Sequence, residues 1–341
     1  MRSIERKHCQ TVVLMGIALA VCILLSFTLG RYPVPLSELL GILGNKLGLP
    51  ITPFWTSQME AAVWNIRLPR VILSVLVGAC LAAAGGAYQG VFQNPMASPD
   101  ILGASAGAGF GAALAILLGA TSIGITFGAF AASLVTVALV FTVSRHVRGD
   151  RVLGLVLAGI MISSLFQAGT SFLKLVADPN NQLPQITYWL MGSLSGAKWS
   201  DLGFVLIPMF CGLVPLVLLR WQLNVITMGD DEARAMGVNP QRIRMGIVIC
   251  STLVTASAVS VSGMIGWVGL VIPHMMRRLV GSDYRFLMPA SILSGGMFLL
   301  IADNVSRNVT ASGIPIGILT AFIGAPFFLW LITGKGDHYE H

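Results

Sequence analysis

Long apolar runs separated by short polar segments dominate this chain of 341 residues. An α-helix needs about 20 residues to cross the hydrocarbon core of a bilayer, and each run is close to that length. The runs fall at about 12–30, 71–92, 101–119, 121–144, 152–176, 202–219, 245–262, 265–280, 286–303 and 314–333. We therefore predict an all-α integral membrane protein with about ten transmembrane helices. Pro273 is expected to break the eighth helix.

The composition supports a membrane protein. Hydrophobic residues make up 55% of the chain and charged residues only 10%, against about 25% charged residues in soluble domains. No soluble domain or low-complexity linker separates the runs, so residues 1–341 are predicted to form one transmembrane domain. The first run follows a basic head but lacks a convincing cleavage site, and it is interpreted as a retained helix. The five cysteines are scattered singly and suggest neither a metal site nor a disulfide framework.

The distribution of Lys and Arg predicts the orientation. An even number of spans places both termini on one side, and basic residues concentrate on the cytoplasmic side. With the N-terminus inside, most of the 21 basic residues lie in inner segments. The outer segments keep only Arg31, Lys46, Arg67, Arg70, Lys174, Lys198 and Arg307. Both termini are therefore predicted to be cytoplasmic, and the net charge of +7 reflects this bias and anionic lipid rather than nucleic acid.

One polar segment, 224–244, interrupts the apolar pattern with the string GDDEARAMGVNPQRIR. Its carboxylates stand in the first turn of a predicted helix, where the helix dipole favours them. Gly237 and Pro240 predict a turn into a second helix. A loop of about two to eight residues would connect two membrane helices more simply. We therefore predict a cytoplasmic docking element for a soluble partner.

A weak internal repeat suggests how the helices are related. RLPRVILSVLVG from Arg67 and RIRMGIVICSTLV from Arg242 each open a block of four helices, namely helices 2–5 and 7–10. Blocks that begin five helices apart enter the membrane from opposite faces. This arrangement is an inverted-topology repeat, which commonly brackets a translocation path. Coincidence is the alternative.

Two features near the second and third helices bear on packing and on the path. Glycines at four-residue spacing allow helices to approach closely, and we favour this interpretation over contact with a substrate: Gly86, Gly90, Gly103, Gly107 and Gly111. Between them, Pro95 and Pro99 prevent a continuous helix through QNPMASPD. Unwound backbone at membrane depth is tolerated where protein or water satisfies it, so this loop is predicted to line a path.

Enzyme chemistry is not indicated. The chain has no GxxxxGK[ST] loop, no HExxH motif, no nucleophile elbow and no paired buried carboxylates. It is not expected to hydrolyse ATP itself, and no catalytic or metal-ligating residue is predicted. A carrier driven by an ion gradient, the alternative function, usually needs acidic or His groups near the bilayer midplane. Here Asp100 and Asp303 are placed at helix ends, and His274 stands alone. A membrane-embedded enzyme is a third, less favoured class.

Several ordered motifs resemble the FecCD permeases, the membrane subunits of ABC importers for iron–siderophores, haem and cobalamin. The motifs are RLPR (67–70), QNPMASPDILG (93–103), GDDEARAMGV (229–238), GWVGLVIPHMMRR (266–278), LIADNVSRN (300–308) and IPIGILTAFIGAPFFLWLI (314–332). The resemblance implies a multi-pass permease of a prokaryotic cytoplasmic (inner) membrane that forms a homodimer around a central path. It also implies two cytoplasmic ATPase subunits, which hold ATP–Mg, and an extracytoplasmic binding protein. No cofactor is expected on this chain itself.

The resemblance also assigns roles to residues. Arg67, Arg70 and Arg307 match arginines that, in vitamin B12 permeases of the family, pair with carboxylates of the binding protein; snorkelling anchors are the alternative. The ATPase-facing coupling helices match about 224–244, with contacts expected from Gly229, Asp230, Asp231, Glu232, Ala233, Arg234, Met236 and Gly237.

The cytoplasmic gate of the family includes an NPL tripeptide, which here reads Asn94, Pro95 and Met96. Met keeps the bulk and the apolar character of Leu. A second gate element between helices four and five does not match RGDR (148–151) cleanly and stays unassigned. The expected function is import of a ferric siderophore or related chelate by alternating access. The sequence does not identify the chelate, and it does not decide between a homodimer and a heterodimer.

Overall fold

The computed structural model of the chain describes residues 2–30, 32, 34–147, 151–310 and 313–333, and within these ranges the regular elements are all helical. The α-helices are α1 (Arg2–Thr28), α2 (Leu36–Lys46), α3 (Ser57–Ala61), α4 (Leu68–Val91), α5 (Ala104–Leu117), α6 (Ser122–Ser144), α7 (Arg151–Val176), α8 (Gln182–Leu190), α9 (Trp199–Leu218), α10 (Arg220–Met228), α11 (Asp230–Ala235), α12 (Pro240–Ser262), α13 (Val268–Val280), α14 (Tyr284–Val309) and α15 (Ile316–Thr333). A π-helix, Ala62–Arg67, joins α3 to α4, and a 3-10 helix, Pro99–Leu102, precedes α5. Most of the RGDR segment and the C-terminal residues 334–341 lie outside the described residues.

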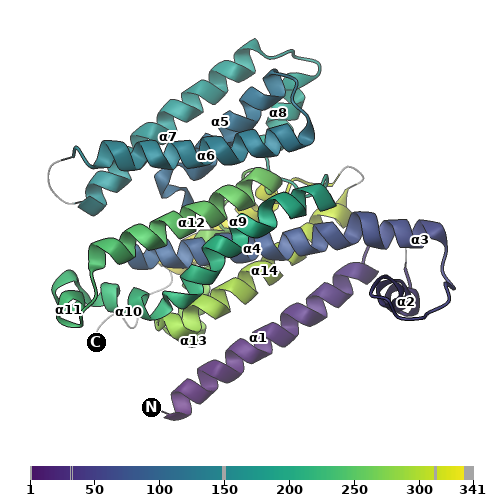
Figure 1. Cartoon of the computed structure of the whole chain (residues 1–341), viewed down its shortest axis with the longest axis horizontal. Coiled ribbons are helices and arrows are strands. Elements are labelled where there is room, and N and C mark those ends of the chain that lie inside the picture. The colour runs from purple at the N-terminus through teal and green to yellow at the C-terminus, as the bar shows by residue number, and fades with distance from the viewer. Residues whose placement is uncertain (1, 31, 33, 148–150, 311–312, 334–341) are drawn as a thin grey trace.

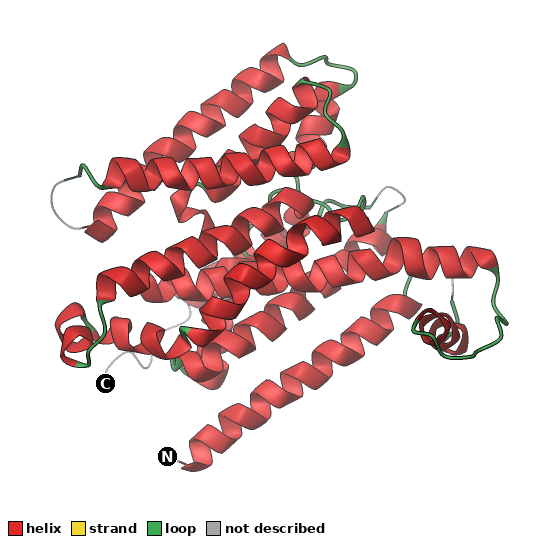
Figure 2. Cartoon of the chain, in the orientation of Figure 1, coloured by secondary structure: helices red, strands yellow, loops and turns green. Residues whose placement is uncertain are grey.

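Each of the ten predicted membrane helices corresponds to a helix in the structure. Among the described residues, seven helices are long and apolar enough to cross a membrane. The other three predicted spans are α5 and α15, which are apolar but shorter, and α13, with 13 residues. The all-α membrane fold is therefore confirmed (Figure 2).

The predicted break at Pro273 is wrong, because α13 runs through this residue without interruption. A proline inside a helix leaves the carbonyl four residues earlier without its usual partner. Here that carbonyl belongs to Gly269 and faces Gly85 on α4, where an added Cβ would stand only 1.7 Å from the oxygen. α4 therefore packs closely against this turn of α13.

The second membrane helix begins earlier than its apolar run predicts. The helical stretch extends continuously over Ser57–Val91, and the side chain of Thr56 caps its start by accepting from the Met59 amide at 3.3 Å. Arg67 and Arg70 therefore project from a helix rather than from a loop. Two short helices, α2 and α8, also lie between the predicted spans, in the segments 31–70 and 177–201.

The helices form two packed groups. A central group surrounds α4, which packs against α9, α12, α13 and α14, and α1 lies on its flank (Figure 1). A second group consists of α5, α6, α7 and α8, with its own apolar core. Glycines make the close contacts, as predicted: an added Cβ on Gly111 would meet the Gly128 carbonyl oxygen of α6 at 2.2 Å. Such contacts leave no room for side chains between the helices.

The ends of the molecule are distinct. The start of α1 lies at the same end as α10 and α11, whereas α2 and α3 lie at the opposite end (Figure 1).

The helices that open the two predicted repeats, α4 and α12, pack side by side and run in opposite directions. An inverted repeat requires this relation between its first helices.

Candidate coupling, gate and docking sites

The segment predicted to dock a soluble partner forms two short helices, α10 and α11, at one end of the molecule (Figure 1). Gly237 closes α11 with a φ of +77°. Its amide donates to Arg234 O at 3.0 Å, and the amide of Val238 donates to Ala233 O at 2.9 Å. This pair of bonds is a Schellman motif, which requires a left-handed residue that is usually glycine. The predicted turn at Gly237 is therefore present.

The residues predicted to contact the ATPase differ in exposure. The Asp231 carboxylate is 93% exposed, and Met236 is 44% exposed. Ala233 is fully buried, so it supports α11 from below rather than facing a partner. Asp230 reaches Arg244 of α12 at 2.7 Å and fixes the angle between α11 and α12. Sequence reasoning missed Met228, which is 64% exposed beside this surface.

Asn224 ties α10 to the start of α14. Its amide nitrogen donates to Asp283 Oδ1 at 2.7 Å, and its amide oxygen accepts from the backbone N–H of Tyr284 at 2.8 Å. Burial works to raise the pKa of Asp283, but hydrogen bonds from Arg285 and Asn224 outweigh it and hold the pKa below its ordinary value. The carboxylate is therefore ionised at neutral pH, which strengthens the hydrogen bonds that Asn224 and Arg285 donate to it.

The same contacts continue into α4. The hydroxyl of Tyr284, a residue only 3% exposed, donates to Gly86 O at 2.9 Å and accepts from Arg277 Nη2 at 3.1 Å. Arg277 Nη1 in turn donates to Gln89 Oε1. We call Asn224, Tyr284, Arg277 and Gln89 the polar path. It connects the predicted docking segment with the last two turns of α4.

The predicted gate follows directly after α4. Gln93 takes a left-handed φ of +46° and closes α4 with a second Schellman motif, in which the Asn94 amide donates to Gln89 O at 3.2 Å. The side chain of Gln93 donates to the Ile226 carbonyl in α10 at 3.0 Å. Asn94 Oδ1 then accepts from the Met96 amide at 2.9 Å, which makes a tight turn. Met96 stands at its tip and is 54% exposed.

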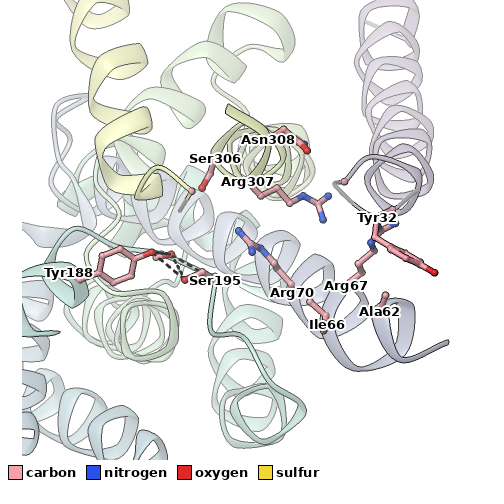
Figure 3. A pocket seen from close by; sticks show the side chains of 13 residues that line it. Tyr32, Ala62, Ile66, Arg67, Arg70, Tyr188, Ser195, Ser306, Arg307 and Asn308 are labelled. Carbon is pink, nitrogen blue, oxygen red and sulfur yellow. Dashed lines mark hydrogen bonds between the residues drawn. The ribbon is translucent and has the colours of Figure 1, made fainter. Parts of the chain in front are cut away.

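At the opposite end, Arg67, Arg70 and Arg307 line one pocket of about 290 Å³ (Figure 3). Arg67 comes from the π-helix, Arg70 from α4 and Arg307 from α14. Tyr188 and Ser195 form the other side, and their hydroxyls lie 3.3 Å apart. The structure thus brings Arg307 beside Arg67 and Arg70, from which it is far removed in the sequence.

Arg70 has a buried counterion, Asp303. Its Nε lies 3.0 Å from both carboxylate oxygens, and its Nη2 lies 2.8 Å from Oδ1. Asp303 is fully buried. The prediction that Asp303 marks a helix end is wrong, because α14 continues to Val309. Among the described residues, three guanidiniums line the pocket and the Asp303 carboxylate pairs with one of them, so the pocket is electropositive.

The other two arginines are held by α1 and the chain that follows it. Arg67 donates to the carbonyls of Phe27 and Tyr32, and Arg307 donates to Ser26 O at 2.7 Å and Ser26 Oγ at 2.8 Å. Arg67 is only 6% exposed. These contacts do not fit freely snorkelling anchors, because the guanidiniums are fixed around the pocket.

No group of three or more His, Cys, Asp or Glu side chains is placed to hold a metal ion in the part of the chain that the structure describes.

Comparison with known proteins gives three findings. A sequence model of the FecCD transport family matches residues 18–334. The chain is similar to the molybdate import system permease protein MolB of Haemophilus influenzae, with 37% identity over 319 residues that cover 93% of this chain and 94% of that protein. It is also similar to the hemin transport system permease protein HmuU of Yersinia pestis, with 39% identity over 308 residues, 86% of this chain and 90% of that protein. A solved ABC transporter of metal-chelate type, in an inward-facing conformation, has a TM-score of 0.85 and 34% identity, and the match covers 96% of this chain and 99% of that chain.

Proposed function

The chain belongs to the FecCD transport family, and from this premise we propose that its cargo is a ferric siderophore or a related metal chelate such as haem or cobalamin. The protein is the membrane-spanning permease subunit of an ABC importer, and ATP hydrolysis belongs to a separate subunit. It is a multi-pass membrane protein. Family membership decides against a carrier driven by an ion gradient.

The polar path is the observation that carries the proposed mechanism. In this proposal, a cytoplasmic ATPase binds the exposed surface around Asp231 and Met236. When the ATPase subunits close on ATP, α10 and α11 move with them. Asn224 of α10 transmits this movement to α14, because its side chain accepts a hydrogen bond from the backbone of Tyr284. Gln93, at the end of α4, follows α10 because its side chain donates to the Ile226 carbonyl. The turn at Met96 then opens or closes the path on the cytoplasmic side.

The pocket of three arginines is proposed as the docking site for the extracytoplasmic binding protein. An acidic side chain of that protein fits an electropositive pocket whose guanidiniums are already oriented, since little side-chain entropy remains to be lost on binding. The hydroxyls of Tyr188 and Ser195 offer further hydrogen bonds at its rim. In a homodimer the pocket occurs twice, so two acidic side chains of one binding protein are held at a fixed spacing.

The cargo is proposed from the family and from its relatives. One relative is named for hemin and the structural neighbour for a metal chelate, whereas another relative is named for molybdate. We favour a chelate because the quoted motifs resemble the FecCD permeases, a resemblance that implies iron–siderophores, haem or cobalamin as cargo. Molybdate is the competing cargo.

Reconstitution tests the proposal. The permease and its ATPase are placed in proteoliposomes with ATP inside, and the binding protein encoded beside the permease gene is added outside with a ferric siderophore, haem, cobalamin or molybdate. We expect ATP-dependent uptake of one chelate and no uptake with a non-hydrolysable ATP analogue. Uptake of molybdate alone would overturn the assignment of the cargo. Uptake without ATP would overturn the coupling mechanism.

A further inference from the structure

A groove beside α12 is not explained by coupling, gating or docking. It lies between the ends of α4 and α6 and the starts of α7 and α12, and its volume is about 590 Å³. Its walls are mainly apolar and include Phe92, Phe141, Leu155 and Ile249. Arg242 and Arg244 stand on its rim at the start of α12.

The groove opens on a face that is suited to lipid. Ile249 is 56% exposed at its edge, and the neighbouring α9 exposes Ile207 by 71%, Phe210 by 48% and Val214 by 48%. These residues belong to helices that are long and apolar enough to cross a membrane. An exposed apolar stripe on such a helix lies against acyl chains. The groove therefore opens on a face that acyl chains can contact.

The position of the two arginines matches the headgroup layer. α12 begins at Pro240, so its first residues, including Arg242 and Arg244, form the end of the polar segment 224–244. From Arg242 to Ile249 the helix rises about 10 Å at 1.5 Å per residue. The charged rim thus lies near the membrane surface, while the apolar floor extends toward the acyl chains. Arg242 is exposed, and Arg244 is 22% exposed while it bridges to Asp230.

Gly246 keeps the groove open. It lies inside α12, where glycine is less favourable than alanine, and an added Cβ would meet no described atom within 4 Å. Gly85 differs, since a Cβ there would stand 1.7 Å from the Gly269 carbonyl oxygen. Packing within the described chain therefore leaves space over Gly246, and this space belongs to the groove.

We propose that this groove is a binding site for one anionic phospholipid of the cytoplasmic leaflet. Arg242 and Arg244 bind the phosphate, and the acyl chains lie over Gly246 between Phe141 and Ile249. Clusters of basic side chains at the edge of membrane helices attract anionic headgroups. The apolar floor supplies contact that a soluble anion could not use.

The test measures lipid binding rather than transport. The purified full-length chain is delipidated in detergent and titrated with phosphatidylglycerol or phosphatidylcholine of the same acyl chains, and bound lipid is counted by native mass spectrometry. We expect one tightly bound phosphatidylglycerol that excess inorganic phosphate does not displace. Arg242→Gln should weaken the binding of phosphatidylglycerol about fivefold, which is the effect of one basic residue near an anionic headgroup. The binding of phosphatidylcholine should not change.

A second variant separates the groove from general lipid contact. Gly246→Phe fills the groove and should strongly weaken the binding of phosphatidylglycerol. Gly203→Phe is the matched control, because an added side chain at this α9 glycine also meets open space but lies outside the groove. Equal affinity for the two lipids, or unchanged binding in Gly246→Phe with a normal unfolding temperature, would overturn the proposal.

Discussion

Substitutions at Gly237 should uncouple transport from ATP hydrolysis. The size of the effect should depend on how well each residue tolerates a left-handed backbone. The residue has a φ of +77°, and an added Cβ would meet nothing within 4 Å. A substitution therefore acts through backbone strain and not through a clash. Asn tolerates the left-handed region, Ala does so poorly, and Val, which is β-branched, is the worst. We expect uptake to fall in the order Gly, Asn, Ala, Val.

The magnitude follows from the strain. A non-glycine residue in the left-handed region costs about 1–2 kcal/mol. This energy corresponds to a factor of about 5–30 in the population of the native turn. Gly237→Val should therefore lose most of its uptake, while Gly237→Asn keeps most of it.

The assay compares uptake and transport-stimulated ATPase activity in proteoliposomes that contain equal amounts of permease. Gly119→Val is the control. Gly119 has a φ of +72° with open space around it, and its amide closes α5 by the same bond pattern, 3.0 Å to Ile116 O. The control variant should suffer equal strain but keep its coupling. Full uptake by Gly237→Val, or equal uncoupling by Gly119→Val, would refute the reasoning.

Three further experiments test other sites. Arg70→Ala should destabilise the protein by about 3–5 kcal/mol, because it leaves the buried Asp303 without a counterion. Removing both charged side chains, Arg70 and Asp303, should destabilise it less. An unchanged unfolding temperature in Arg70→Ala would contradict this reasoning. Cysteines at Asn94 or Met96 in a cysteine-free background should cross-link two copies in at least one nucleotide state, unless the turn lies away from the dimer axis. Tyr284→Phe loses bonds of 2.9 and 3.1 Å, worth about 1–3 kcal/mol when buried groups lose their partners, and should lower the cargo carried per ATP hydrolysed. An unchanged ratio would remove Tyr284 from the coupling mechanism.

The length of the apolar runs predicts the membrane helices, because most of these helices are apolar on every side. It fails where polar side chains face the protein interior. Asp303 and Arg307 lower the local hydropathy, so the predicted helix stops at 303, although α14 continues to Val309. Arg67, which is only 6% exposed, hides the start of the second span in the same way. An acidic residue beside an apolar run is a usable signal, since such a group needs a partner inside the membrane.

Local motifs in the site were predictable, and long-range contacts were not. The turn at Gly237 depends on hydrogen bonds between residues three and five positions apart, so its chemistry is visible in the sequence. The polar path joins Tyr284 to Asn224 across 60 positions and to Gly86 across 198 positions. No periodic pattern relates such residues. For the same reason, the arginines could be assigned to one face, but their pocket could not be described.

The ion pair between Arg70 and Asp303 has a consequence for biogenesis. The two residues are 233 positions apart in the chain. At about 5–20 residues per second, a ribosome needs about 12–47 s to add Asp303 after Arg70. Throughout this interval the guanidinium has no carboxylate partner and must stay hydrated at the membrane surface. The packing of α4 against α14 around this ion pair can therefore form only after α14 has entered the membrane, so a central contact of the fold is made late in synthesis.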